Sequence, residues 1–312
     1  MIDPLPLYRK ITSFFPMQER WLDEFRASAL FIDTETSQIL PTDGGKLIEL
    51  GFSIVIDGKL TASDDLIIQT PYCPMTWGAA YLNPVLNNLL KVRCGDKYAA
   101  AIREIDENSG SIYDVPLVPD DIKNMASKKD GIPLFATAYD ITNISADRTM
   151  REGVDRIDAL KWMQSLIDTM HSSGGQVLAG HNHVNFDLMW FAYEFDKYLN
   201  IGMEIHESLL WDTGMFVKGL KTELDMLPNQ SVYDYYRDVS DARSSAKWSL
   251  DSSCIKDFSL DEIDGVDPDR QHESAAYDCE VSYILTKAVA AGRKLNCETT
   301  KPTYTPRRSS SC

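Results

Sequence analysis

Apolar residues in the N-terminal part of the chain come in short runs separated by turn residues, a pattern typical of β-strands. The run at 29–32 predicts a first strand, and residues 47–56 predict a second strand that ends at an Asp-Gly hairpin signal. Residues 66–69 predict a third strand, so the three strands are expected to form an antiparallel meander. A short amphipathic helix is expected before them, at about 18–28.

Further along the chain, apolar positions recur every three or four residues, which predicts amphipathic helices. These helices are expected at about 154–171, 187–198, 213–220, 249–256 and 274–291. Strands are expected between them at 176–179 and 209–212, and the long segment 221–247 is interpreted as a loop. Strands followed by helix–strand alternation predict an α/β fold with a mixed central sheet flanked by helices.

The domain organisation follows from where this regular pattern is interrupted. We expect a single domain over residues 1–297, with an insertion or lid at about 71–150, where prolines punctuate an irregular pattern. Residues 298–312 are rich in Pro, Thr, Ser and Arg and have no apolar periodicity, which predicts a disordered tail.

Composition narrows the class of protein. The chain has 47 acidic and 31 basic residues, and its formal net charge of −16 argues against broad, sequence-independent binding along nucleic acid. The six cysteines form no C-x-x-C pair, which favours reduced thiols and disfavours a structural zinc site. No apolar run approaches the roughly 20 residues of a membrane span, and the N-terminus does not resemble a secretory signal. A cytoplasm-like, reducing compartment is therefore expected.

The first candidate for chemistry lies at the end of the first predicted strand. Asp33 and Glu35 are two residues apart, so in a strand their carboxylates face the same side. Adjacent carboxylates repel one another and ionise together only when a cation lies between them. Oxygen ligands of this kind suit Mg²⁺ or Mn²⁺. Taken alone, the pair equally fits a solvated strand end.

The second candidate is the segment 180–187, with the sequence GHNHVNFD. A strand is expected to end there, followed by a tight polar loop, and Asp187 is expected to open a helix. A carboxylate at that junction can project over the edge of the sheet, although an N-cap role for Asp187 is the alternative. His181 and His183 are interpreted as hydrogen-bonded structural groups rather than a metal-binding pair.

The third candidate is the segment 272–278, which leads into the closing helix. Asp278 lies about one turn inside that helix, and His272 lies in the loop before it. The alternative is that Asp278 is an exposed helical residue. Each of the three candidates is weak alone, but their order and their attachment to a strand end, a helix start and a helix are specific.

Taken together, these segments resemble the motifs of DEDD-type 3′→5′ exonucleases, the DnaQ-like branch of the ribonuclease H-like superfamily. The matching segments are Phe31–Thr36 with Lys46–Gly51 for the first motif, Gly180–Asp187 for the second, Trp211–Thr213 for the "DT" segment, Trp248–Asp251 for the following helix start and His272–Asp278 for the third motif. The resemblance covers about residues 29–70 and 154–291 and implies a ribonuclease H-like fold.

The resemblance also implies a mechanism. Asp33, Glu35, Asp187 and Asp278 are expected to hold two Mg²⁺ or Mn²⁺ ions, with Glu35 also contacting the attacking water. His272 is expected to act as the general base, as in the His-bearing (DEDDh) branch. The implied reaction is hydrolysis of the terminal phosphodiester at the 3′ end of single-stranded DNA or RNA, which releases 5′-mononucleotides.

One departure from the family pattern concerns the general base. The His-bearing branch spaces its third motif H-x4-D, whereas His272 and Asp278 are spaced H-x5-D. Strict spacing places Glu273 at the position of the histidine, and the Y-x3-D spacing of the Tyr-bearing branch falls on Ser274. We favour His272, because a bulge of one residue in a loop can still deliver its ring, and keep Glu273 as the alternative base.

Substrate contacts are expected from residues close to the motifs. We expect the terminal nucleotide to contact Thr34, Thr36, Asn182 and Phe186. The segment 233–247 alternates aromatic and basic residues, which fits stacking and phosphate contact with a single strand as well as it fits an ordinary surface loop. Trp190 and Phe191 are interpreted as core residues.

Two other functions remain compatible with the sequence. One is a catalytically silent ribonuclease H-like module that binds nucleic acid or a protein. The other is a proofreading subunit that acts with a separate polymerase or with another replication or repair protein. The presence of all four carboxylates favours the enzyme, and its expected location is cytoplasmic or with nucleic acid in a reducing compartment.

Overall fold

The computed structural model describes residues 1–15, 26–37, 41, 45–70, 88, 91, 96, 99, 142, 144, 146–172, 176–250, 252–270, 274–296 and 299–302. The helix expected at 18–28, the insertion expected at about 71–150 and the tail expected at 298–312 lie mainly outside the described residues. These three expectations stay predictions.

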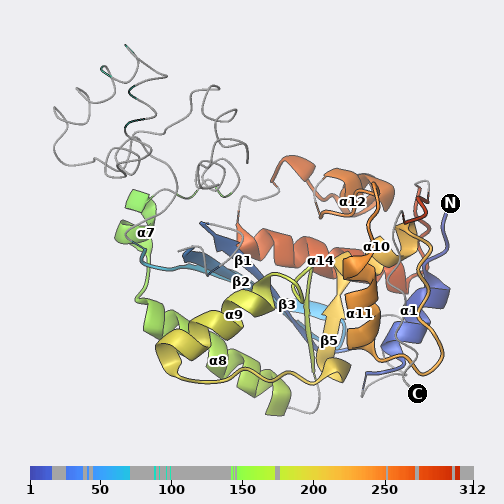
Figure 1. Cartoon of the computed structure of the whole chain (residues 1–312), viewed down its shortest axis with the longest axis horizontal. Helices are drawn as coiled ribbons and strands as arrows, with labels where there is room; N and C mark the ends of the chain where they lie inside the picture. The colour runs from blue at the N-terminus through green and yellow to red at the C-terminus, as the bar shows by residue number, and fades with distance from the viewer. Residues whose placement is uncertain are drawn as a thin grey trace.

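A five-stranded mixed sheet forms the centre of the described part (Figure 1). Its strands are β1 (Ala29–Thr36), β2 (Leu47–Ile56), β3 (Lys59–Ile67), β4 (Val177–Gly180) and β5 (Leu210–Asp212). The spatial order is β3-β2-β1-β4-β5, with antiparallel pairing among the first three strands of the chain and parallel pairing of β1 with β4 and of β4 with β5. The predicted α/β class and the meander followed by parallel strands are confirmed.

The bounds predicted for the third strand, 66–69, are wrong. β3 begins at Lys59, directly after a tight turn in which Asp57 and Gly58 both have positive φ, as a two-residue hairpin requires. Most residues of β3 are exposed, and its sequence, KLTASDDLI, is polar at most positions. The periodicity of apolar residues therefore could not reveal its full length.

Alternate residues of β1 face two different apolar clusters. Ala29 and Phe31 belong to the cluster that includes α14 (Ala275–Ala290), whereas Leu30 and Ile32 belong to the cluster that includes α8 (Arg156–Ser172) and α9 (Asp187–Glu194). Figure 1 shows α14 on one side of the sheet and α8 with α9 on the other. The same alternation determines which side chains in the second half of β1 face α14 and which face α9.

The other described helical segments are α1 (Leu5–Thr12), α7 (Ala146–Glu152), η3 (Phe195–Leu199), η4 (Glu207–Leu209), α10 (Thr213–Lys221), α11 (Val232–Asp241), α12 (Ser252–Asp257), α13 (Leu260–Asp264) and η5 (Pro268–Arg270). The sequence did not predict α1, which buries Tyr8 edge-on against Trp211 with ring centroids 5.5 Å apart. Among the described helices, none combines the length and the apolar character needed to cross a bilayer.

The segment interpreted as a loop, 221–247, contains helix α11, so that interpretation is wrong. Ser231 caps the helix by accepting a hydrogen bond from the backbone N–H of Asp234. Tyr235 and Tyr236 are both buried in the core. These two tyrosines therefore cannot serve as an exposed stacking surface, whereas Tyr233 is exposed. Contact of this segment with a single strand stays a prediction.

Candidate metal centre

Three carboxylates meet where β1 ends against the first turn of α14. Asp33, Glu35 and Asp278 each offer an oxygen, and these atoms all lie within 4.8 Å of one another. The two β1 residues share a face because they are two positions apart, and that face is the one covered by α14. Asp278 is buried, so the alternative interpretation of Asp278 as an exposed helical residue is wrong.

Asp187 approaches the same end of β1 from the opposite face of the sheet. It is the first residue of α9, and its Oδ1 accepts a 2.5 Å hydrogen bond from the hydroxyl of Thr34. Thr34 stands between Asp33 and Glu35 in the strand and therefore points toward α9. The N-cap position of α9 belongs to Phe186, so Asp187 is not the N-cap considered as an alternative.

The electrostatics of this centre favour a bound cation. Burial, together with the charges of Asp187, Asp278 and Glu35, raises the pKa of Asp33 well above its ordinary value. Burial and the neighbouring carboxylates also raise the pKa of Glu35 well above its ordinary value. Burial raises the pKa of Asp187 to about 7, although the bond from Thr34 opposes this shift. Ionising these groups together is unfavourable without a positive charge between them.

The donor set fits a hard divalent cation. All the groups are carboxylates, and oxygen donors suit Mg²⁺ and Mn²⁺ better than they suit softer metals. A cation held among them would favour the ionised forms that burial alone disfavours. Asp33, Glu35 and Asp278 are the residues whose oxygens converge, and Asp187 is close enough for its charge to raise the pKa of Asp33.

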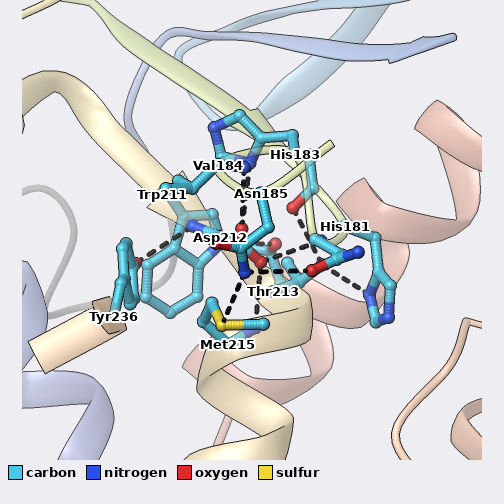
Figure 2. A network of polar contacts seen from close by, with 12 residues as sticks. His181, His183, Val184, Asn185, Trp211, Asp212, Thr213, Met215 and Tyr236 are labelled. Atoms are coloured by element: carbon cyan, nitrogen blue, oxygen red, sulfur yellow. Dashed lines mark hydrogen bonds and ion pairs between the residues drawn. The ribbon is translucent and has the colours of Figure 1, made fainter. Parts of the chain in front are cut away.

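A buried aspartate organises the loop that leads to Asp187. Figure 2 shows Asp212, the last residue of β5, among the backbone groups of this loop and of α10. Its carboxylate accepts hydrogen bonds from the backbone N–H groups of Asn182 at 2.9 Å, Val184 at 3.1 Å and Met215 at 2.9 Å. Asp212 thus caps α10 and fixes the loop at the same time.

Close backbone packing reinforces this loop. Asn182 has a positive φ of 61°, and a Cβ atom at Gly214 would lie 2.7 Å from the backbone nitrogen of Asn182. Only glycine at position 214 lets α10 come this close to the loop. The loop geometry is therefore determined by contacts with β5 and α10.

Both loop histidines were predicted to be hydrogen-bonded structural groups, and this is confirmed for His181 but not for the ring of His183, whose two nitrogens have no hydrogen-bond partner among the described residues. Nδ1 of His181 lies 2.9 Å from the hydroxyl of Thr213, and its Nε2 lies 2.9 Å from the backbone carbonyl of Trp248. His183 is fully buried with Nδ1 3.5 Å from a carboxylate oxygen of Asp212, and burial lowers its pKa to about 3. His183 is therefore neutral at physiological pH.

The four residues expected to contact the substrate lie at the end of β1 and in the loop before α9. Thr34 and Thr36 are buried at the end of β1, and Asn182 contributes to the turn described above. Phe186 is half-buried and packs against the apolar cluster on the α8 and α9 side. Contact of these residues with a nucleotide stays a prediction. Trp190 and Phe191 are fully buried, which confirms their interpretation as core residues.

His272 and Glu273 lie outside the described residues, so the choice of general base stays a prediction. Two residues with clear structural connections to the centre received no functional role from the sequence. One is Asp212, and the other is Glu49, which lies opposite Glu35 in the pairing of β1 with β2. A lone charge inside the apolar run of β2 is the signal that could have drawn attention to Glu49.

Comparison with solved structures finds similarity to exonuclease I. A crystal structure of E. coli exonuclease I in complex with a dA16 oligonucleotide is 12% identical, with a TM-score of 0.47, covering 86% of this chain and 41% of that chain. A product-bound structure of exonuclease I is 12% identical, with a TM-score of 0.48, covering 86% of this chain and 44% of that chain. An ExoI/SSB-Ct complex is 13% identical, with a TM-score of 0.47, covering 86% of this chain and 42% of that chain.

The chain thus spans about two fifths of the length of the solved chains that it matches. No protein-family model matches the sequence, and a search of curated proteins finds no match.

Proposed function

We propose that the protein is a metal-dependent 3′→5′ exonuclease that hydrolyses terminal phosphodiesters of single-stranded nucleic acid and releases 5′-mononucleotides. The observation that carries this proposal is the convergence of Asp33, Glu35 and Asp278, with buried Asp187 beside them. These are the four acidic positions of the DEDD motifs, and they come from three distant parts of the chain.

In the proposed mechanism, Asp33, Glu35, Asp187 and Asp278 hold the divalent cations, two Mg²⁺ or Mn²⁺ ions by family resemblance. When bound, these ions supply positive charge to the reacting phosphodiester and increase the acidity of a water molecule. Thr34 orients Asp187 through its hydroxyl, and Asp212 holds the loop that precedes it. His272 takes a proton from the attacking water while the water oxygen bonds to phosphorus. The P–O3′ bond breaks, and the O3′ of the shortened strand takes up a proton from solvent.

The net charge limits how the substrate is held. A formal charge of −16 opposes binding along a long duplex, because such binding relies on many Lys and Arg contacts to phosphates. A strand end that enters a metal-bearing site needs only local contacts. The proposed substrate is therefore the 3′ terminus of a single strand.

The test combines metal binding with cleavage. Purified protein is mixed with 3′-labelled DNA or RNA oligonucleotides and Mg²⁺ or Mn²⁺, and the thermal shift caused by each metal is measured in parallel. Wild type is compared with Asp33→Asn and with the control Asp158→Asn, which neutralises an exposed carboxylate on α8. We expect the control to retain both signals and Asp33→Asn to lose mononucleotide release and most of the thermal shift.

Two results would contradict the proposal. If wild type releases no mononucleotide with Mg²⁺ and none with Mn²⁺, the proposed enzymatic function is wrong. Oligonucleotide binding under those conditions would then favour a catalytically silent module. Equal release by wild type and Asp33→Asn would show that the activity does not arise from this centre.

A further inference from the structure

Glu49 is a fully buried carboxylate beside the proposed metal centre. It lies on β2 directly opposite Glu35 in the strand pairing. Its Oε2 accepts a 2.8 Å hydrogen bond from the backbone N–H of Ala275, the first residue of α14. Its Oε1 has no hydrogen-bond partner among the described residues. Burial raises the pKa of Glu49 to about 7, and its charge raises the pKa of Glu35.

Close packing occurs between β2 and α14 at the same point. Gly51 lies opposite Asp33 in the strand pairing, and a Cβ atom at Gly51 would lie 2.2 Å from the carbonyl carbon of Ala275. No side chain fits in that space, so the strand backbone and the first residue of the helix are in direct contact. Glu49 and Gly51 therefore determine together where α14 begins relative to β1.

The start of α14 determines where Asp278 lies. Asp278 is three residues after Ala275 and so within the first turn of the helix. The first backbone N–H groups of a helix have no partner inside the helix, and a buried one without an acceptor is unfavourable. Glu49 satisfies one of these groups, and the positive end of the helix dipole favours a carboxylate at that place.

We propose that Glu49 is a positioning residue that holds the first turn of α14 so that Asp278 can share a divalent cation with Asp33 and Glu35. This inference rests on the proposed metal-dependent function. The position of a hydrogen-bond acceptor at Glu49 is what matters, and its negative charge is secondary. Outer contacts of this kind commonly change metal affinity by about 10- to 100-fold.

Two substitutions separate position from charge. Glu49→Gln keeps an oxygen acceptor at the same reach and removes the charge, whereas Glu49→Asp keeps the charge and shortens the reach by one methylene. The matched control is Glu194→Asp, which shortens another buried glutamate; Glu194 pairs with Arg156 at 2.7 Å. The control measures what a shortened buried glutamate does to stability without contact with α14.

The experiment titrates each full-length variant with Mn²⁺ and records the thermal shift, with mononucleotide release measured in parallel. We expect the half-saturating Mn²⁺ concentration to rise by about tenfold or more in Glu49→Asp and to stay within about threefold of wild type in Glu49→Gln and Glu194→Asp. A wild-type midpoint in Glu49→Asp, or equal impairment of Glu49→Gln, would overturn the positioning role. If Glu49→Asp does not fold, Glu49→Gln is compared with Glu49→Ala, which removes the acceptor for the N–H of Ala275. A wild-type Mn²⁺ midpoint in Glu49→Ala would then overturn the positioning role.

Failure of the proposed function gives a different result. If wild type shows no thermal shift with Mn²⁺, the metal centre itself is wrong, whatever the variants do. If wild type shifts and Glu49→Asp matches it, the metal centre stands and only the role of Glu49 is refuted.

Discussion

The hydroxyl of Thr34 donates a 2.5 Å hydrogen bond to Oδ1 of Asp187, and this contact joins the central strand β1 to the first residue of α9. Both side chains are buried. Because the bond goes to the carboxylate, it favours the ionised form of Asp187, whereas burial raises the pKa of that group to about 7. Thr34 thus acts against the effect of burial on a proposed metal ligand.

Replacing Thr34 with valine tests this contact, because valine has nearly the same shape and no hydroxyl. We expect Thr34→Val to lower the free energy of unfolding at pH 8 by about 2 kcal/mol, the order of a hydrogen bond to a charged group. Mononucleotide release should fall as well, since Asp187 loses its orientation. Urea unfolding and single-turnover cleavage measure the two effects, and Thr34→Ser serves as the control that keeps the hydroxyl. Equal stability of the valine and serine variants would contradict the role of the bond.

Stability of the metal-free protein should depend on the ionisation of Asp187. Its pKa rises from an ordinary 3.8 to about 7 in the folded state, so between these values the folded protein binds more protons than the unfolded chain. The contribution of Asp187 to the free energy of unfolding is therefore greatest at the acidic end of this range and is lost as the pH rises through about 7. His183 acts in the opposite sense, because burial lowers its pKa from 6.5 to about 3 and it stabilises less as the pH falls.

Comparison with Asp187→Asn cancels the contribution of His183, which is present in both proteins, and reports the Asp187 carboxylate together with the effect of its charge on Asp33. In chelator, we expect wild type to lose roughly 2 kcal/mol of stability relative to Asp187→Asn between pH 5 and pH 8. Saturating Mn²⁺ at pH 8 should restore much more stability to wild type than to the variant. Chemical denaturation at each pH gives the comparison, and parallel pH profiles of the two proteins would refute the prediction.

Much of the fold was predictable because burial leaves a periodic pattern in the sequence. Strands β1 and β2 are apolar runs bounded by turn residues, and the helical spacing after residue 150 matches α8, α9 and α14. Two of the differences between the predicted and the observed elements have physical causes. β3 is an exposed edge strand with mostly polar residues, and α11 shows its apolar face only at the spacing of Val232, Tyr235, Tyr236 and Val239, which aromatic composition disguised.

The site was predictable to the extent that it depends on local spacing. Residues two apart on a strand must share a face, which is how Asp33 and Glu35 could be paired without a structure. The contacts of Glu49 with α14 and of Asp212 with the loop before Asp187 join segments far apart in the chain. No periodicity encodes such contacts, because they arise only when the sheet and helices pack together.

Asp212 should be essential for the shape of the loop that precedes Asp187. Asp212→Ala leaves three backbone N–H groups without their acceptor, so we expect a loss of about 3 kcal/mol or more in the free energy of unfolding and at least a tenfold loss of activity. Asp212→Asn should lie between this variant and wild type, because an amide keeps one acceptor oxygen. Urea unfolding and cleavage of a labelled oligonucleotide provide the measurements.

A control separates lost stability from lost geometry. Ser231→Ala removes the cap of α11, which should cost about 1 kcal/mol without altering cleavage by the folded protein. If Asp212→Ala kept full activity under conditions where it is folded, the loop would not need Asp212 to place Asp187.

The general base can be identified by comparing two neighbouring substitutions. His272 and Glu273 directly precede Ser274, the N-cap of α14, and the family spacing alone favours Glu273. An imidazole titrates near neutral pH and therefore suits proton transfer better than an ordinary carboxylate. We expect His272→Ala to lose about 100-fold or more in the single-turnover rate and Glu273→Ala to lose less than about tenfold.

Both variants should retain the Mn²⁺-induced thermal shift, because neither residue is a proposed metal ligand. The reverse ranking would assign proton transfer to Glu273, and loss of the thermal shift in His272→Ala would mean that the histidine supports metal binding instead of accepting the proton.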